Sequence, residues 1–191
     1  MFLLLPSIGL GIIAGFIRGG DLSRLAELRF RYGWLVIVAF LVQLAIFTSW
    51  FTWLNLRADL IPFLHIASLF VLLMVVLANR SFFGLNILGI GLMLNFLVIV
   101  ANGGFMPVSG KAMQQIGLVQ ELATMREQGY SSKGTLATPD TPLAFLGDNF
   151  HIDAPFVREK VFSMGDALIG VGAFIFVSQA MVRRRRRWGW S

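Results

Sequence analysis

The longest polar segment of the chain begins at Asn102-Gly103-Gly104-Phe105-Met106-Pro107-Val108-Ser109 and continues to Lys160. We call residues 103–160 the polar segment. Near its end the chain reads Leu146-Gly147-Asp148-Asn149-Phe150, and the next apolar run begins at Phe162-Ser163-Met164-Gly165-Asp166. Apolar runs lie on both sides of this segment. We therefore interpret the rest of the chain as a scaffold that presents it.

The composition indicates a membrane protein. Of the 191 residues, 57% are hydrophobic and 14% are charged, against roughly 45–50% and about 25% in soluble domains. The apolar residues form runs close to the length of about 20 residues that crosses a bilayer as a helix. We predict an all-α polytopic membrane helix bundle, one membrane domain over residues 1–191. Its five transmembrane helices are expected near residues 1–17, 33–53, 61–78, 82–101 and 162–182.

The distribution of charge predicts the orientation. The connection 18–31, the link at Arg80 and the C-terminal tail together hold ten arginines and two acidic residues, and the opposite side holds six basic and eight acidic residues. Cytoplasmic loops carry the excess of Lys and Arg. The C-terminus should therefore be cytoplasmic. The N-terminus and the polar segment should lie outside a bacterial plasma membrane.

The basic tail and the absence of cysteine limit the possible partners and chemistries. The tail directly follows an apolar run, so it is interpreted as an anionic-lipid anchor and not as a nucleic-acid arm. It consists of Arg183, Arg184, Arg185, Arg186 and Arg187. A chain without cysteine has no disulfide and no thiolate chemistry. No dinucleotide, phosphate-loop or haem fingerprint is present, and no cofactor is expected.

A repeated glycine spacing predicts close packing of the first helix. Gly11, Gly15 and Gly19 recur every four residues, a spacing that favours close helix contact in a bilayer.

Apolar residues at three- and four-residue steps within 109–129 predict an amphipathic helix on the outer interface, ended by Gly129. Residues 130–142 are typical of an exposed, turn-rich connection, and residues 143–150 should return to the membrane surface.

Asp148 and Asp166 are the candidate catalytic residues. They lie 18 positions apart in the sequence and should both be near the outer interface. Two carboxylates that share a proton can activate water and protonate a leaving group. The structural alternative is also specific, because Ser163-x-x-Asp166 is the pattern of a helix N-terminal capping box. Asp148 could equally be a turn residue after Gly147.

Several other polar residues are candidates for binding. A tight backbone feature at Gly103-Gly104 could line a groove for an extended peptide or a lipid head group, or could simply end a helix. The binding candidates are Asn102, Gly103, Gly104, Pro107 and Ser109. Gln43 and Asn95, within predicted spans, are assigned to interhelical packing. His65 and His151 lack a spaced ligand motif, and no metal site is predicted.

These motifs support two resemblances. The 102–109, 146–148 and 162–166 stretches resemble a family of uncharacterised bacterial integral membrane proteins, catalogued as a domain of unknown function. Separately, residues 162–167 are similar to the segment of lipoprotein signal peptidases that carries their second catalytic aspartate, and Asp148 stands about where the first would lie. The asparagine and arginine of that family's first motif are missing here, the loop is longer, and the first span is extra.

Two functions follow as expectations. The first is a non-catalytic accessory, scaffold or binding protein that presents the outer loop, with a possible membrane protein partner. The second is an intramembrane aspartic peptidase-like hydrolase that uses Asp148 and Asp166 on a membrane-tethered substrate.

Overall fold

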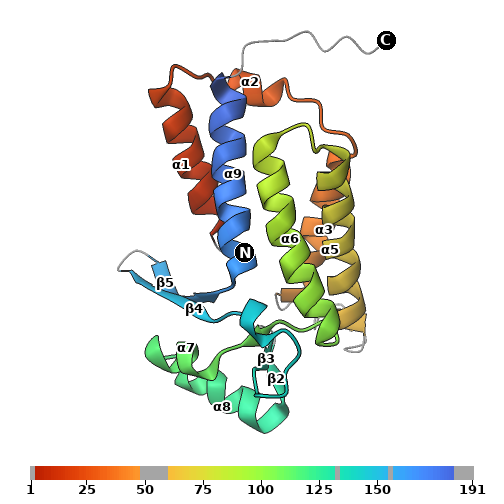
Figure 1. The fold of residues 1–191 in the computed structure, drawn as a ribbon, viewed down its shortest axis with the longest axis vertical. Helices are drawn as coiled ribbons and strands as arrows, with labels where there is room; N and C mark the ends of the chain where they lie inside the picture. The colour runs from red at the N-terminus through yellow and green to blue at the C-terminus, as the bar shows by residue number, and fades with distance from the viewer. Residues whose placement is uncertain (1–2, 48–59, 132–133, 155–156, 183–191) are drawn as a thin grey trace.

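Five apolar helices dominate the computed structural model, which describes residues 3–47, 60–131, 134–154 and 157–182 (Figure 1). These helices are α1 (Leu4–Ile17), α3 (Gly33–Phe47), α5 (Leu60–Ala78), α6 (Phe83–Ala101) and α9 (Met164–Val182). A short helix, α2 (Ser23–Ala26), follows α1. The helical prediction is confirmed for these runs, since long unbroken stretches of Leu, Ile, Val and Phe satisfy their backbone only as helices in an apolar environment.

Three of the five helices are long and apolar enough to cross a membrane. α5, α6 and α9 each have 19 residues, about 28 Å at 1.5 Å per residue, close to the bilayer core of about 30 Å. α1 and α3 have 14 and 15 described residues. The predicted spans 1–17 and 33–53 are therefore longer than the helices described. Trp50 and Trp53, expected to mark the end of the second span, lie outside the described residues.

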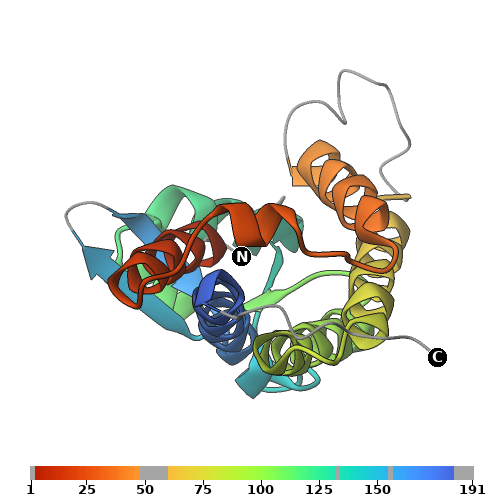
Figure 2. The same ribbon diagram turned by 90° about the horizontal axis from the view of Figure 1, so that it is seen from above.

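The helices form a curved row whose order differs from the order in the sequence. Seen from above, α9 lies between α1 and α6, and the row continues through α5 to α3 (Figure 2). Each helix packs on its neighbours in this row. The last helix of the described residues, α9, is therefore an interior member of the row, and it contacts both α1 and α6.

Glycines set the close contacts of α9. Gly84 and Gly172 face each other across α6 and α9, and so do Gly91 and Gly165; a Cβ on any of them would meet backbone of the opposite helix. The predicted glycine stripe of α1 is correct for Gly11 and Gly15, which pack on α9.

The third glycine of that stripe behaves differently. Gly19 has no neighbour within 4 Å of a built Cβ and has φ +72°, so it lies in the turn after α1 and takes no part in packing. A left-handed glycine just past a helix is a common way to end it.

The connections lie at two opposite ends of the bundle. α2 and the turn between α5 and α6 lie at the end where α9 finishes, and the polar segment lies at the other end (Figure 1). The Arg24 guanidinium donates to the carbonyls of Met181 (2.9 Å) and Val182 (3.1 Å), the last carbonyls of α9. The side of the membrane that each end faces remains a prediction.

The polar segment contains strands as well as helices, so the all-α prediction is wrong for this part of the chain. Its helices are α7 (Gly110–Gln115), α8 (Val119–Gln128) and the 3-10 turn η1 (Ala144–Leu146). Its strands are β1 (Pro107–Val108), β2 (Tyr130–Ser131), β3 (Gly134–Leu136), β4 (Phe150–Ala154) and β5 (Val157–Phe162). β1 pairs parallel and β2 antiparallel with β3, and β4 and β5 form an antiparallel hairpin. Part of the stretch 130–142 is thus sheet.

The prediction of a single amphipathic helix over residues 109–129 is wrong, because this stretch forms two helices. Gly117, at φ +72°, separates α7 from α8. Met113 of α7 and Leu122 and Met125 of α8 are buried within the polar segment itself, where they pack with Val108 of β1. Val119 of α8 is 63% exposed.

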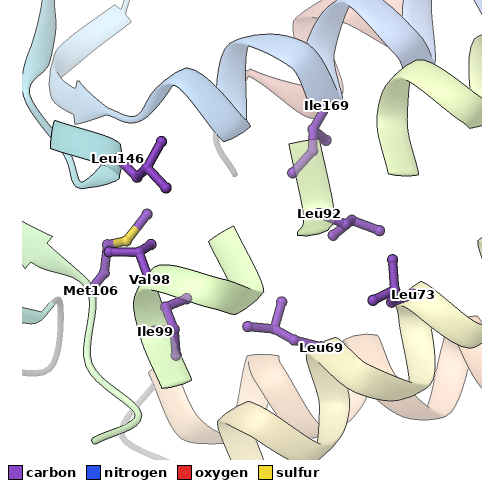
Figure 3. Close-up of a cluster of buried hydrophobic side chains, with 8 residues drawn as sticks. All are labelled: Leu69, Leu73, Leu92, Val98, Ile99, Met106, Leu146 and Ile169. Atoms are coloured by element: carbon purple, nitrogen blue, oxygen red, sulfur yellow. The ribbon is translucent and has the colours of Figure 1, made fainter. Parts of the chain in front are cut away.

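A second apolar cluster joins the polar segment to the bundle. Leu146 of η1 and Met106 lie against Val98 and Ile99 at the end of α6 (Figure 3). The cluster continues along the helices through Leu69, Leu73, Leu92 and Ile169. Within residues 143–150, the stretch expected at the membrane surface, η1 packs on the end of α6 through Leu146.

Candidate functional site

Asp166 belongs to a closed hydrogen-bond network between α6 and α9. Its backbone N–H donates to Ser163 Oγ (3.0 Å), so the predicted N-terminal cap is confirmed. The Ser163 hydroxyl donates to Asn95 Oδ1 (2.9 Å), and Asn95 Nδ2 donates to Asp166 Oδ1 (2.9 Å). All three residues are buried. A buried carboxylate needs such donors, because burial removes water from its charge.

The backbone of Asp148 is fixed by the strand next to it. Asp148 forms an isolated parallel bridge with Val108. Its N–H donates to the Pro107 carbonyl (2.8 Å), and its own carbonyl accepts from the Ser109 N–H (3.0 Å). The preceding residue must be small, since a Cβ on Gly147 would meet the Pro107 carbonyl oxygen. The 102–109 and 146–148 motifs thus form one structural unit.

The Asp148 side chain is the least satisfied polar group of the described residues. Its Oδ1 is buried and has no hydrogen-bond partner, although the residue as a whole keeps some exposure. Burial raises the pKa of Asp148 to about 7, and the nearby charge of Asp166 adds to the effect. That Asp148 and Asp166 act as a pair remains a prediction. The Asp148 carboxyl can carry a proton near neutral pH.

The binding candidates lie at the end of α6 and in the first part of the polar segment. The Asn102 amide donates to the carbonyls of Val98 (2.8 Å) and Pro142 (2.9 Å). Gly103 and Gly104 have φ +65° and +95° and lie in the turn after α6, and Pro107 is buried in β1. Ser109 caps α7 by accepting from the Ala112 N–H (3.4 Å). Ligand binding by these residues remains a prediction.

Polar residues inside the bundle pair with one another. Gln43 Nε2 donates to Ser68 Oγ (3.3 Å), which joins α3 to α5. His65 Nδ1 lies 2.9 Å from the Gly104 carbonyl oxygen.

Asn95 also makes an interhelical contact, but its partners are Ser163 and Asp166, at the start of α9. Sequence reasoning assigned Asn95 to packing and did not connect it with Asp166. Its polarity within an apolar run is the signal that pointed to it.

The described parts of the chain contain no group of three or more His, Asp or Glu side chains arranged to hold a metal ion. His151 lies in β4 and is exposed. The arginine tail, proposed to bind anionic lipid, lies outside the described residues.

The fold and the site define a mostly helical protein with three helices suited to cross a membrane and a structured polar segment at one end of them. The chain belongs to a family of unknown function, DUF5317, whose profile matches residues 27–178. It is also similar to an uncharacterized protein of Thermotoga maritima, with 26% identity over 157 residues that cover 82% of this chain and 80% of the relative. No solved structure matches it.

Proposed function

We propose that this protein is a multi-pass membrane hydrolase that uses Asp148 and Asp166 as an acid–base pair on a membrane-tethered peptide or lipid. The observation that carries the proposal is the buried, unpartnered Oδ1 of Asp148 beside a second buried carboxylate. Buried polar groups in folded proteins are almost always satisfied. An exception next to a like charge costs stability, and such costs concentrate at functional sites.

The two carboxyl groups suit different steps of hydrolysis. Asp148, with a pKa of about 7, can hold a proton under neutral conditions. Asp166 is oriented by the Asn95 amide and can take a proton from water. Water would then add to the scissile carbonyl while Asp148 protonates the departing amine or alcohol. The bond from the carbonyl carbon to that leaving group breaks.

A second candidate is a non-catalytic accessory or scaffold protein. The observation that favours it is the complete network of Ser163, Asn95 and Asp166. This network gives Asp166 a structural purpose, because it caps α9 and ties it to α6. In this case the polar segment would bind a membrane protein partner, and Asp148 would not need to react.

One comparison separates the two candidates. Cells lacking the native protein are supplied with the wild type, Asp148→Asn or Asp166→Asn, and their membrane peptides and lipids are compared by mass spectrometry. A hydrolase predicts that both variants accumulate the same uncleaved species. Asp140→Asn, an exposed change in the same segment, is the control.

A different result would contradict the hydrolase proposal. If both folded variants leave every membrane species unchanged, and the wild type purifies with a stoichiometric partner that the variants also retain, the hydrolase proposal is wrong and the scaffold remains.

A further inference from the structure

We propose that a second site, an open pocket in the polar segment, binds a phosphate-bearing ligand. The pocket lies between α7, α8 and β3 and has a volume of about 430 Å³, within the usual range of roughly 300–1,000 Å³ for small-molecule sites. Its walls include Ser109, Lys111, Gln114, Arg126, Leu136 and Asn149. Neither Asp148 nor Asp166 lines it.

The charge of the pocket favours an anion. Lys111 of α7 and Arg126 of α8 reach the same space from different helices, and none of the described lining residues is acidic. Within the described ranges, no ion pair is formed by either cation. Two like charges around one cavity repel, and a dianion between them would remove that repulsion. A phosphate monoester carries about −1.5 to −2 charges near pH 7 and balances both cations, whereas a carboxylate balances one.

The neutral groups of the pocket complete a phosphate site. The Ser109 oxygen accepts the Ala112 N–H, so its own hydroxyl proton remains available to donate. Gln114 lies one helical turn from Lys111 on the same face of α7 and adds an amide donor. Arg126 offers the planar fork that matches phosphate oxygens, and Lys111 offers a point charge. Leu136 supplies an apolar wall that suits the carbon part of a phosphate ester.

The wall of the pocket is rigid on the side of Asp148. Asn149 Nδ2 donates to the carbonyls of Ala144 (2.7 Å) and Gly147 (3.2 Å), so this side chain shapes the wall and does not supply a donor. Asn149 follows Asp148 directly, and the Ser109 N–H donates to the Asp148 carbonyl. A ligand in this pocket would therefore lie on the same structural unit as Asp148. Its binding does not require the proposed hydrolysis, and Asp148→Asn should retain it.

The test uses the full chain in phosphatidylcholine nanodiscs. Calorimetry measures binding of inorganic phosphate and glycerol 3-phosphate, and native mass spectrometry measures retention of phosphatidic acid added to the disc. We expect the wild type to bind at least one probe. We expect Lys111→Gln/Arg126→Gln to weaken that binding about ten-fold or more, because two charge-assisted contacts are lost. Binding of soluble probes alone indicates a free phosphate ester, and retention of phosphatidic acid alone indicates a lipid head group.

Two control proteins keep the result interpretable. Arg18→Gln/Arg80→Gln removes the same charge at exposed positions of the opposite end and should bind like the wild type. Lys111→Arg/Arg126→Lys keeps both charges in the pocket and should bind within a few-fold of the wild type. The proposal is overturned if the wild type binds none of the probes, or if the two double Gln variants lose binding equally.

Discussion

At the scale of single residues, Asp148 is held in place by neighbours that do not satisfy its carboxyl group. Its backbone N–H donates to the Pro107 carbonyl of β1, and its carbonyl accepts from the Ser109 N–H. Its side-chain Oδ1, in contrast, is buried without a partner. Folding therefore pays a desolvation cost at a position that the strand geometry fixes. A sequence selected only for stability would place an amide or a small residue here.

Replacing Asp148 with Asn should stabilise the protein in a pH-dependent way. The folded pKa of about 7 lies above the ordinary value of 3.8, so the folded state holds the proton more tightly than the unfolded state. Stability of the wild type should then fall as the pH rises from about 4 to about 7, and the penalty is complete above that range. Asp148→Asn lacks this penalty. It should be more stable by about 2–4 kcal/mol at pH 8 and nearly equal at pH 4.

Thermal unfolding in detergent across this pH range measures the effect. Asp140→Asn, in an exposed turn, is the control and should follow the wild type. Parallel pH profiles for the wild type and Asp148→Asn would mean that the carboxyl is solvated in the folded protein.

Asn95 should be essential for stability, although it was predicted only to pack. Asn95→Ala removes one hydrogen bond to the buried Asp166 carboxylate and one acceptor for Ser163. We expect a loss of about 1.5–3 kcal/mol, the usual range for bonds to charged groups. Asn86→Ala, on an exposed position of the same helix, should cost less than about 0.5 kcal/mol. Equal unfolding midpoints for the two variants would show that the network contributes nothing.

At the scale of elements, the contact between α6 and α9 depends on paired glycines. A Cβ at Gly172 would meet the Leu88 backbone and the Gly84 carbonyl oxygen. Gly172→Ala should therefore separate the two helices and destabilise the protein by about 1–3 kcal/mol, as overpacking does. Gly9→Ala is the matched control, since nothing lies within 4 Å of its Cβ. It should be neutral or stabilising by up to about 1 kcal/mol, because Ala has the higher helix propensity. Unfolding midpoints in detergent compare the two variants, and a smaller loss at Gly172 than at Gly9 would contradict this account.

Sequence reasoning could predict the helices but not most of the polar segment. Apolar runs such as 83–101 are long enough to dominate any local preference, and the ends of α5, α6 and α9 were predicted within two residues. The strands of the polar segment have two to six residues, and β1 pairs with β3, 28 positions away. Such pairings depend on tertiary register. The break at Gly117 was missed because the apolar spacing continues across it.

The candidate site was predictable to a similar extent. Asp148, Ser163 and Asp166 lie close together in sequence, next to recognisable turn and cap signals. Asn95 lies 71 positions before Asp166, and no local pattern shows which face of α6 meets α9. The glycine pairs Gly84–Gly172 and Gly91–Gly165 determine that register, and their pairing is visible only in the structure.

At the scale of the whole molecule, the polar segment and the basic connections occupy opposite ends of one helix row. The apolar cluster around Leu146 and Met106 fixes the polar segment to the end of α6 (Figure 3). The Asp148–Asp166 pair lies at this junction, because Asp166 begins α9 and Asp148 follows η1. The proposed pair would therefore combine a residue in the first turn of a helix suited to cross the membrane with a residue of the polar segment.

This arrangement makes the orientation testable with single cysteines. The chain has no cysteine, so each substitution introduces one thiol. Asp140→Cys labels the polar segment, and Ser81→Cys labels the turn between α5 and α6; both positions are exposed. If the arginine-rich end is cytoplasmic, a membrane-impermeant maleimide added to intact cells should modify Asp140→Cys and leave Ser81→Cys unmodified until the membrane is opened.

Labelling of Ser81→Cys alone in intact cells would show that the orientation is the reverse of the predicted one. Asp148 and Asp166 would then lie on the cytoplasmic side. The substrates open to such a pair would then be membrane-tethered groups exposed in the cytoplasm. The labelling pattern thus decides on which side of the membrane a cleavage product should be sought.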